Sequence, residues 1–163
     1  MTALTLPESP RGFQPVFLVP GSMFCTAGSG IVSTVLGSCV SICLWDAATR
    51  VGGMNHYVLP HAPAGEISLR YGDVAISALW RAMERHGAER RRIRAKIFGG
   101  AAVLSVGPDE TVGEKNVRLA YAWLSERGVP VIAAHTGGEN GMNVRFRTGD
   151  GSAEVRGVNA RRS

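Results

Sequence analysis

Two residues of one short stretch carry side chains suited to covalent chemistry. Cys39 follows Gly37-Ser38, and His56 follows Gly52-Gly53-Met54-Asn55. A thiol becomes a strong nucleophile when a neighbouring base takes its proton, and imidazole is the side chain suited to that task near neutral pH. The pair is therefore compatible with a cysteine hydrolase, in which Cys39 attacks a carbonyl carbon and His56 is the base.

Both residues also have a structural interpretation, because free cysteines and single histidines more often pack than react. Under the catalytic interpretation, the backbone N–H groups of Ser38 and Cys39 are the candidates for holding an oxyanion. A third polar group should orient the imidazole, and the hydroxyls of Ser33 and Thr34 on the preceding strand are the two candidates. The residue types alone leave that choice open.

A zinc site is the other chemistry that this stretch suggests, because Cys39, Cys43 and His56 are all possible ligands. The segment from Cys39 to Trp45 is strand-like, and four residues along a strand span about 13 Å. Two thiolates on one zinc ion must each lie about 2.3 Å from it, so this spacing does not fit. We therefore expect no metal, and a thiol–imidazole mechanism needs no organic cofactor.

Hydrophobic periodicity predicts the elements that must position these residues. An apolar stripe predicts a helix over 72–86, and a capping box from Thr111 to Glu114 begins a second helix that ends at Gly128. Short β-rich runs predict strands over 15–19, 23–27, 31–37, 39–45, 51–59, 94–101, 129–135, 142–148 and 152–158. The predicted fold class is α+β: a single layered domain with a sheet-rich, β-sandwich-like core and two long helices on the outside.

The composition suits one globular domain, since the chain has 163 residues, of which 45% are hydrophobic and 19% are charged. We expect a loose arm over 1–14, the domain over 15–157 and a basic tail over 158–163. The first residues lack the apolar core of a signal peptide, and no run is long enough to span a bilayer. These features, with three cysteines that form no disulfide framework, predict a soluble cytoplasmic protein.

The net charge of +5 leaves a basic surface to be explained. Part of the excess lies in a basic stripe, which we define as Arg90, Arg91, Arg92 and Arg94. Such a run is commonly a solvated loop, and the alternative is that it steers an acidic protein partner toward the chain. Basic and aromatic residues do not alternate, so we expect no nucleic-acid partner.

Several motifs occur in the order that resembles the chemoreceptor glutamine deamidase (CheD) family, from about Phe17 to about Val155. They are L-G-S-C, G-G-M-N-H, RYGDVAISAL, F-G-G-A, G-E-K-N and HTGGENGMNVRFRTGDG. In that family the cysteine of G-S-C is the nucleophile and the histidine of M-N-H is the base, which correspond to Cys39 and His56. A hydroxyl residue six positions before the cysteine completes the family's triad, and that position is Ser33, with Thr34 next to it.

The resemblance implies a sheet-rich fold similar to that of cysteine–histidine deamidase toxins. It implies hydrolysis of chemoreceptor glutamine side chains to glutamate and ammonia, with activity on receptor methyl esters in some members. The implied partners are the cytoplasmic helices of chemoreceptors and a CheC-type phosphatase. Candidates for a substrate loop, or else for turn and cap elements, are Gly99, Gly100, Glu114 and Asn116. The alternatives are a cysteine hydrolase or acyl transferase of other specificity, and a non-catalytic chemotaxis adaptor.

Overall fold

The computed structural model describes residues 14–102 and 107–158, so nearly all of the predicted arm and tail lie outside the described residues. The strands are β1 (Val16–Phe17), β2 (Ser22–Ala27), β3 (Ile31–Leu36), β4 (Val40–Asp46), β5 (Val51–His56), β6 (Arg94–Gly99), β7 (Val131–Thr136), β8 (Met142–Arg147) and β9 (Ala153–Gly157). The helices are α1 (Gly72–Arg85), α2 (Val112–Glu126) and the short 3₁₀ helix η2 (Arg90–Arg92).

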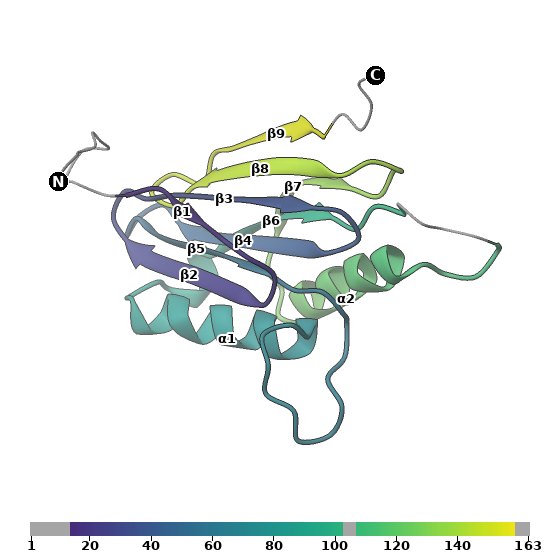
Figure 1. The fold of residues 1–163 in the computed structure, drawn as a ribbon. Coiled ribbons are helices and arrows are strands. Elements are labelled where there is room, and N and C mark those ends of the chain that lie inside the picture. The colour runs from purple at the N-terminus through teal and green to yellow at the C-terminus, as the bar shows by residue number, and fades with distance from the viewer. Residues whose placement is uncertain (1–13, 103–106, 159–163) are drawn as a thin grey trace, which may run out of the picture.

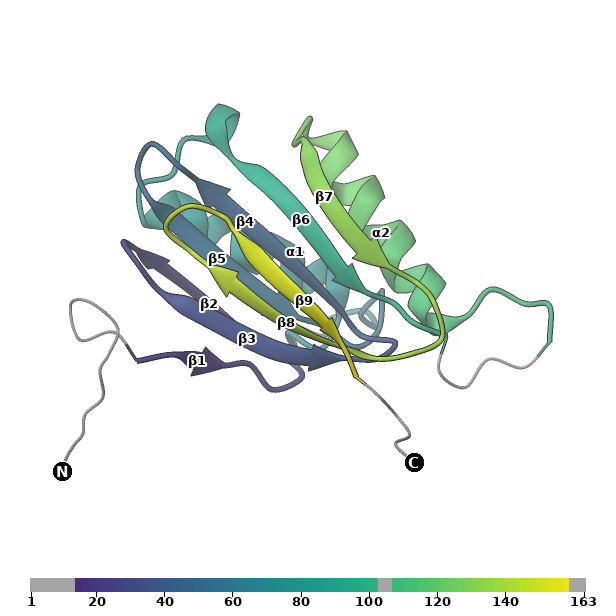
Figure 2. The ribbon, with the colours of Figure 1, turned by 90° about the horizontal axis from the view of Figure 1, so that it is seen from above.

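The strands form two sheets that stack face to face (Figure 1). One sheet has the order β1-β3-β8-β9, and the other has the order β2-β5-β4-β6-β7. Both long helices cover the outer face of the five-stranded sheet, and the four-stranded sheet covers its inner face (Figures 1 and 2). The predicted α+β class, with a sandwich-like core and two helices outside it, is confirmed.

Strand β4 lies in the middle of the five-stranded sheet and is buried along its whole length. Val40, Ile42 and Leu44 pack in the core beneath the helices, while Cys43 and Trp45 pack in the core between the two sheets. A strand covered on both faces needs apolar residues on both, which explains its continuous apolar sequence. The face of β4 that carries Cys43 is therefore the face that looks into the space between the sheets.

The two glycines of β5 allow the layers on either side to approach closely. A Cβ added at Gly52 would overlap the backbone of Thr148, and one added at Gly53 would lie 2.8 Å from Leu79 Cδ1 in α1. These contacts confirm the close backbone approach that glycines inside a strand indicate. They hold β5, and with it His56, tightly between α1 and the four-stranded sheet.

Helix α2 begins at the predicted capping box. The Thr111 hydroxyl accepts a hydrogen bond from Glu114 N at 3.1 Å, and Glu114 Oε1 accepts one from Thr111 N at 2.8 Å.

Neither α1 nor α2, nor any other helix within 14–102 and 107–158, is both long and apolar enough to cross a membrane.

Candidate active site

The register of β4 and β5 brings Cys39 and His56 together. The antiparallel pairs Val40–Tyr57 and Cys43–Met54 place position 41 opposite His56. Cys39 lies two residues before position 41, on the same face, and its side chain packs against the core between the sheets. Cys39 and His56 are therefore diagonal neighbours across the two strands, and among the described residues His56 Nε2 makes no hydrogen bond to the sulfur.

The imidazole of His56 is held by Thr34 of β3. Thr34 Oγ1 lies 2.8 Å from His56 Nδ1 and donates a hydrogen bond to Leu18 O at 2.7 Å. Because a carbonyl only accepts, the single hydroxyl proton points to Leu18, and Thr34 must accept its second bond from Nδ1–H. This arrangement places the imidazole proton on Nδ1 and leaves the lone pair on Nε2, the form that acts as a base.

The structure distinguishes the two hydroxyls that the sequence left open. The side chains of β3 alternate, so Val32, Thr34 and Leu36 are buried while Ser33 is only partly buried. Ser33 lies on the outer side of the four-stranded sheet, beside Arg145 of β8. Of the two candidates, Thr34 contacts His56, and the family position six residues before the cysteine does not.

Asn55, the middle residue of M-N-H, opens the ladder between β4 and β5 beside His56. Its Oδ1 accepts a hydrogen bond from Ile42 N at 2.9 Å, in place of a backbone carbonyl, and its Nδ2 donates to Ala75 O at 3.2 Å. In the part of the chain that the structure describes, His56 Nε2 and Ser41 Oγ are buried without a hydrogen-bond partner. The base atom of the imidazole is therefore free to take a proton.

The turn that carries Cys39 is held by the Gly99–Gly100 segment after β6. Gly100 N donates to Cys39 O, and Ala101 N donates to Gly37 O, each at 2.9 Å. Both glycines have positive φ, and a Cβ at Gly99 would overlap Cys39 O. Only glycine therefore allows this segment to lie directly against the turn.

Asn116 of α2 links the cysteine turn to the chain that follows the histidine. Its Nδ2 donates to Ser38 O at 3.0 Å and to Val58 O at 2.9 Å, and its backbone carbonyl accepts a bond from the Tyr57 hydroxyl at 2.6 Å. Because the side chain is fully buried, these bonds fix the spacing of the two segments.

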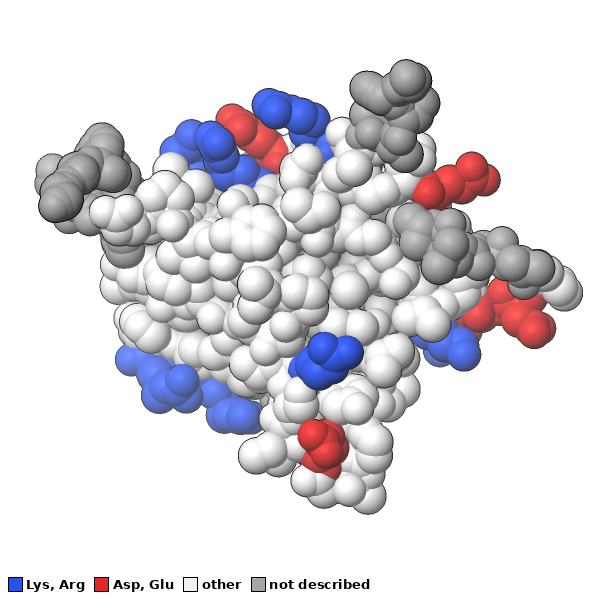
Figure 3. Space-filling model, in the orientation of Figure 1, with Lys and Arg blue, Asp and Glu red and all other residues white. Residues whose placement is uncertain are grey.

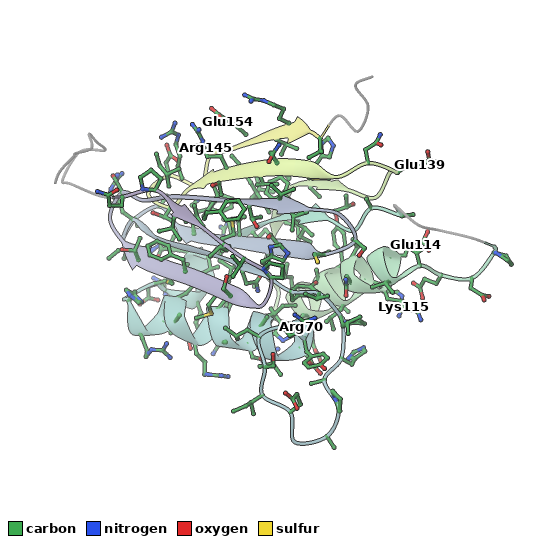
Figure 4. All side chains as sticks on the ribbon, viewed as in Figure 1. Arg70, Glu114, Lys115, Glu139, Arg145 and Glu154 are labelled. Carbon is green, nitrogen blue, oxygen red and sulfur yellow. The ribbon has the colours of Figure 1, made fainter. Side chains whose placement is uncertain are left out.

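The structure thus places Gly99, Gly100 and Asn116 at the cysteine turn as supports. Glu114 lies on the exposed first turn of α2, in the capping box (Figure 4). A role for these four residues in substrate contact stays a prediction.

Burial governs the charge state of the pair. Burial raises the pKa of the Cys39 thiol, and the positive charge of Arg70 and the N–H of Cys39 itself lower it again in part. Burial also lowers the pKa of His56 to about 4, against a smaller opposing effect from the backbone at Leu18. At neutral pH the resting pair is therefore a neutral thiol and a neutral imidazole, not a thiolate and an imidazolium.

The other two thiols lie in environments that suit packing. Cys43 is fully buried, which strongly raises the pKa of its thiol. Burial raises the pKa of Cys25 to about 11, and its Sγ lies 3.7 Å from Met83 Sδ. No group of three or more histidine, cysteine or acidic side chains within the described residues is placed to hold a metal ion.

The basic stripe lies at the other end of the five-stranded sheet from Cys39. Arg94 pairs with Trp45 near the far end of β4, about 20 Å along the chain from Cys39. Arg92 Nε lies 3.1 Å from the buried carboxylate of Asp46, and the Arg90 guanidinium lies 6.0 Å from the Trp80 ring centre. A role of the basic stripe in capturing a partner stays a prediction. The separation of the stripe from Cys39 does not favour that role.

The fold and the site together define a class: a layered α+β protein with a thiol and an imidazole as diagonal neighbours between two sheets, and a threonine hydroxyl bonded to the imidazole. A family model described as CheD chemotactic sensory transduction matches residues 58–157. The chain belongs to the CheD family. The matched range begins after His56 and includes none of Thr34, Cys39 and His56.

Similarity to curated relatives covers most of the chain. The chain is 53% identical over 143 residues to a protein of Rhodospirillum rubrum named "Probable chemoreceptor glutamine deamidase CheD", and the match covers 87% of this chain and 81% of the relative. It is 42% identical over 146 residues to "Probable chemoreceptor glutamine deamidase CheD 1" of Anaeromyxobacter dehalogenans, covering 89% and 85%. A relative of that name from Geobacter sulfurreducens is 38% identical, over 94% of this chain and 82% of its own.

Proposed function

We propose that this protein is a chemoreceptor glutamine deamidase, which hydrolyses glutamine side chains of receptor cytoplasmic helices to glutamate and ammonia. The observation that carries the proposal is the imidazole of His56, held at Nδ1 by Thr34 with a free Nε2 on the face that carries Cys39. The names of the relatives support the substrate class. We also propose that the protein acts in the cytoplasm, where those receptor helices lie.

The reaction begins from the neutral pair. As Cys39 Sγ forms a bond to the amide carbon, the thiol proton moves to His56 Nε2 and the carbonyl oxygen becomes an oxyanion. The N–H of Cys39, beside its own sulfur, and that of Ser38 are the proposed donors to this oxyanion. The imidazolium then gives its proton to the departing nitrogen, the C–N bond breaks, and ammonia leaves a thioester on Cys39.

Water completes the cycle. Neutral His56 takes one proton from a water molecule while the water oxygen attacks the thioester carbon. The C–S bond breaks, the sulfur takes back the proton from Nε2, and the side chain leaves as glutamate. Throughout, the Nδ1–H bond to Thr34 keeps the imidazole oriented and stabilises its charged form.

The test is ammonia release from cytoplasmic fragments of the organism's own receptors, with mass spectrometry of the product. Cys39→Ala should abolish the reaction and leave the fold intact, whereas Cys25→Ala and Cys43→Ala should retain turnover. Substantial turnover by Cys39→Ala would refute the mechanism. A lysine–glutamine cross-link would identify an acyl transferase, and receptor binding without ammonia release would identify an adaptor.

Two finer proposals concern the reaction's range. Receptor methyl esters are a second proposed substrate, because the same attack releases methanol instead of ammonia. A CheC-type phosphatase is a proposed partner that competes with receptors. Methanol release from methylated fragments tests the first proposal, and inhibition of deamidation by the purified phosphatase tests the second.

A further inference from the structure

Arg70 lies at the end of the loop that joins β5 to α1, and the loop returns it to the chain just after His56. Its carbonyl accepts hydrogen bonds from Val58 N at 2.7 Å and Leu59 N at 3.1 Å. The backbone of Arg70 is therefore tied to the same segment that Asn116 ties to the cysteine turn.

The stem of Arg70 is also held in place. A Cβ added at Gly21 would lie 2.9 Å from Arg70 Cγ, and Gly21 has a φ of +80°. The N–H of Gly21 donates to His56 O at 2.8 Å. The side chain of Arg70 therefore packs across Gly21, whose N–H is hydrogen-bonded to the backbone of His56. This contact fixes the direction of the Arg70 stem relative to the site.

The charged end of Arg70 stays exposed and available. In Figure 3 the face toward the viewer is largely uncharged, and a basic group stands out where Figure 4 labels Arg70. Over residues 14–102 and 107–158, the five ion pairs do not include Arg70. No carboxylate offsets the charge of this guanidinium, so its full positive charge can act on a negative charge that forms nearby.

The nearest such charge would form on Cys39. Burial is the main influence on that thiol and raises its pKa, while Arg70 is the charged side chain that lowers it. The other titratable and charged groups on the elements around the turn are Cys43 and Asp46 on β4, His56 on β5, Tyr57 after it, Arg94 and Lys96 on β6, and Glu114, Lys115, Arg118, Tyr121 and Glu126 on α2. Among all these groups and Arg70, Arg70 alone carries a fixed positive charge whose effect reaches the sulfur.

We propose that Arg70 is a positioning residue of the reaction centre, whose fixed charge stabilises the anionic forms of the chemistry. It favours the sulfur of Cys39 as that atom loses its proton, and then the oxyanion formed on the attacked amide. The proposal rests on the proposed function for its second half. Its first half concerns only the thiol and is tested without any substrate.

The first experiment measures the alkylation of Cys39 by iodoacetamide across a pH series, with peptide mapping to separate the three cysteines. Arg70→Gln should move the alkylation midpoint up by roughly half to one pH unit, the effect of one partly solvated charge. Arg70→Lys should restore most of the difference. Arg145→Gln is the matched control, because Arg145 is an exposed arginine on the four-stranded sheet (Figure 4), and it should shift nothing.

The second experiment compares turnover of a receptor fragment with that of a short, uncharged glutamine peptide. Arg70→Gln should lower kcat/KM for both by the same factor, roughly 3- to 10-fold. An unchanged alkylation curve overturns the proposal. A loss confined to the receptor fragment also overturns it, because Arg70 would then be a receptor contact. If the wild type releases no ammonia, the proposed function fails while the alkylation series still decides the effect on the thiol.

Discussion

Replacing Thr34 with valine removes the hydroxyl that holds His56 while keeping the shape of a buried side chain. Thr34 is 1% exposed, and its hydroxyl makes two hydrogen bonds, at 2.7 Å to Leu18 O and at 2.8 Å to His56 Nδ1. Thr34→Val leaves both partners buried and unpaired, at a cost of about 1–3 kcal/mol each. We therefore expect a less stable protein that still folds.

The larger consequence is for turnover. Without an acceptor at Nδ1, the imidazole loses its preference for the form with a free Nε2, together with part of its orientation. A loss of about 1.4–2.8 kcal/mol in transition-state stabilisation corresponds to a roughly 10- to 100-fold lower kcat. Thr34→Ser keeps the hydroxyl and should stay within a few-fold of the wild type.

The decisive comparison is with Ser33→Ala, assayed for ammonia release well below the melting temperature of each variant. Ser33 lies on the other face of β3, so its loss should change kcat by less than about 2-fold. Nitrogen NMR of His56 should show the proton on Nδ1 in the wild type and a mixture in Thr34→Val. If Ser33→Ala loses as much turnover as Thr34→Val, the reasoning from the hydrogen bonds is wrong.

Two further predictions follow from the supports and from burial. Gly99→Ala should lower both stability and kcat, because the new Cβ would overlap Cys39 O. Gly87→Ala is the control: Gly87 also has a positive φ but lies in open space, so this variant should lose only about 1–2 kcal/mol of stability. Urea unfolding and kcat measurements compare the two variants. The pKa of His56 is about 4 in the folded protein and 6.5 ordinarily. As the pH falls, the unfolded chain therefore takes up a proton on His56 before the folded protein does. The free energy of unfolding should fall by about 3 kcal/mol as the pH drops from 6.5 to 4. That slope should disappear in His56→Gln, and its persistence would mean that other groups cause it.

The layered fold was predictable because its elements are locally consistent. Because side chains alternate along a strand, the sequence of β4 alone puts Cys43 and Trp45 on one face and Val40, Ile42 and Leu44 on the other, as observed. The capping box at Thr111 marked the start of α2 in the sequence itself. Such signals depend on the nearest few residues, which is why they need no knowledge of the tertiary fold.

The details of the site depended on which strands meet. The same alternation that sorted β4 would have placed Thr34 beside the buried Val32 and Leu36, but nothing in β3 alone says which face meets His56. The hydrogen bond from Ile42 N to Asn55 Oδ1 and the close approach of Arg70 Cγ to Gly21 both join residues that are separated in sequence. Arg70 is the first residue of the RYGD motif, so the sequence contained it. A charged residue on a loop does not indicate which part of the protein its side chain will face until the loop is folded.

The neutral resting pair has a consequence for life in an oxidising environment. Peroxide attacks thiolates and leaves protonated thiols largely alone, and each step beyond sulfenic acid is irreversible for most proteins. In the proposed mechanism, burial keeps the proton on Cys39 until His56 accepts it, so a sulfur that oxidants attack readily forms mainly while an amide occupies the centre. Oxidative damage to this protein should then accumulate with the number of turnovers, and an idle pool of it would survive a burst of peroxide ready for use.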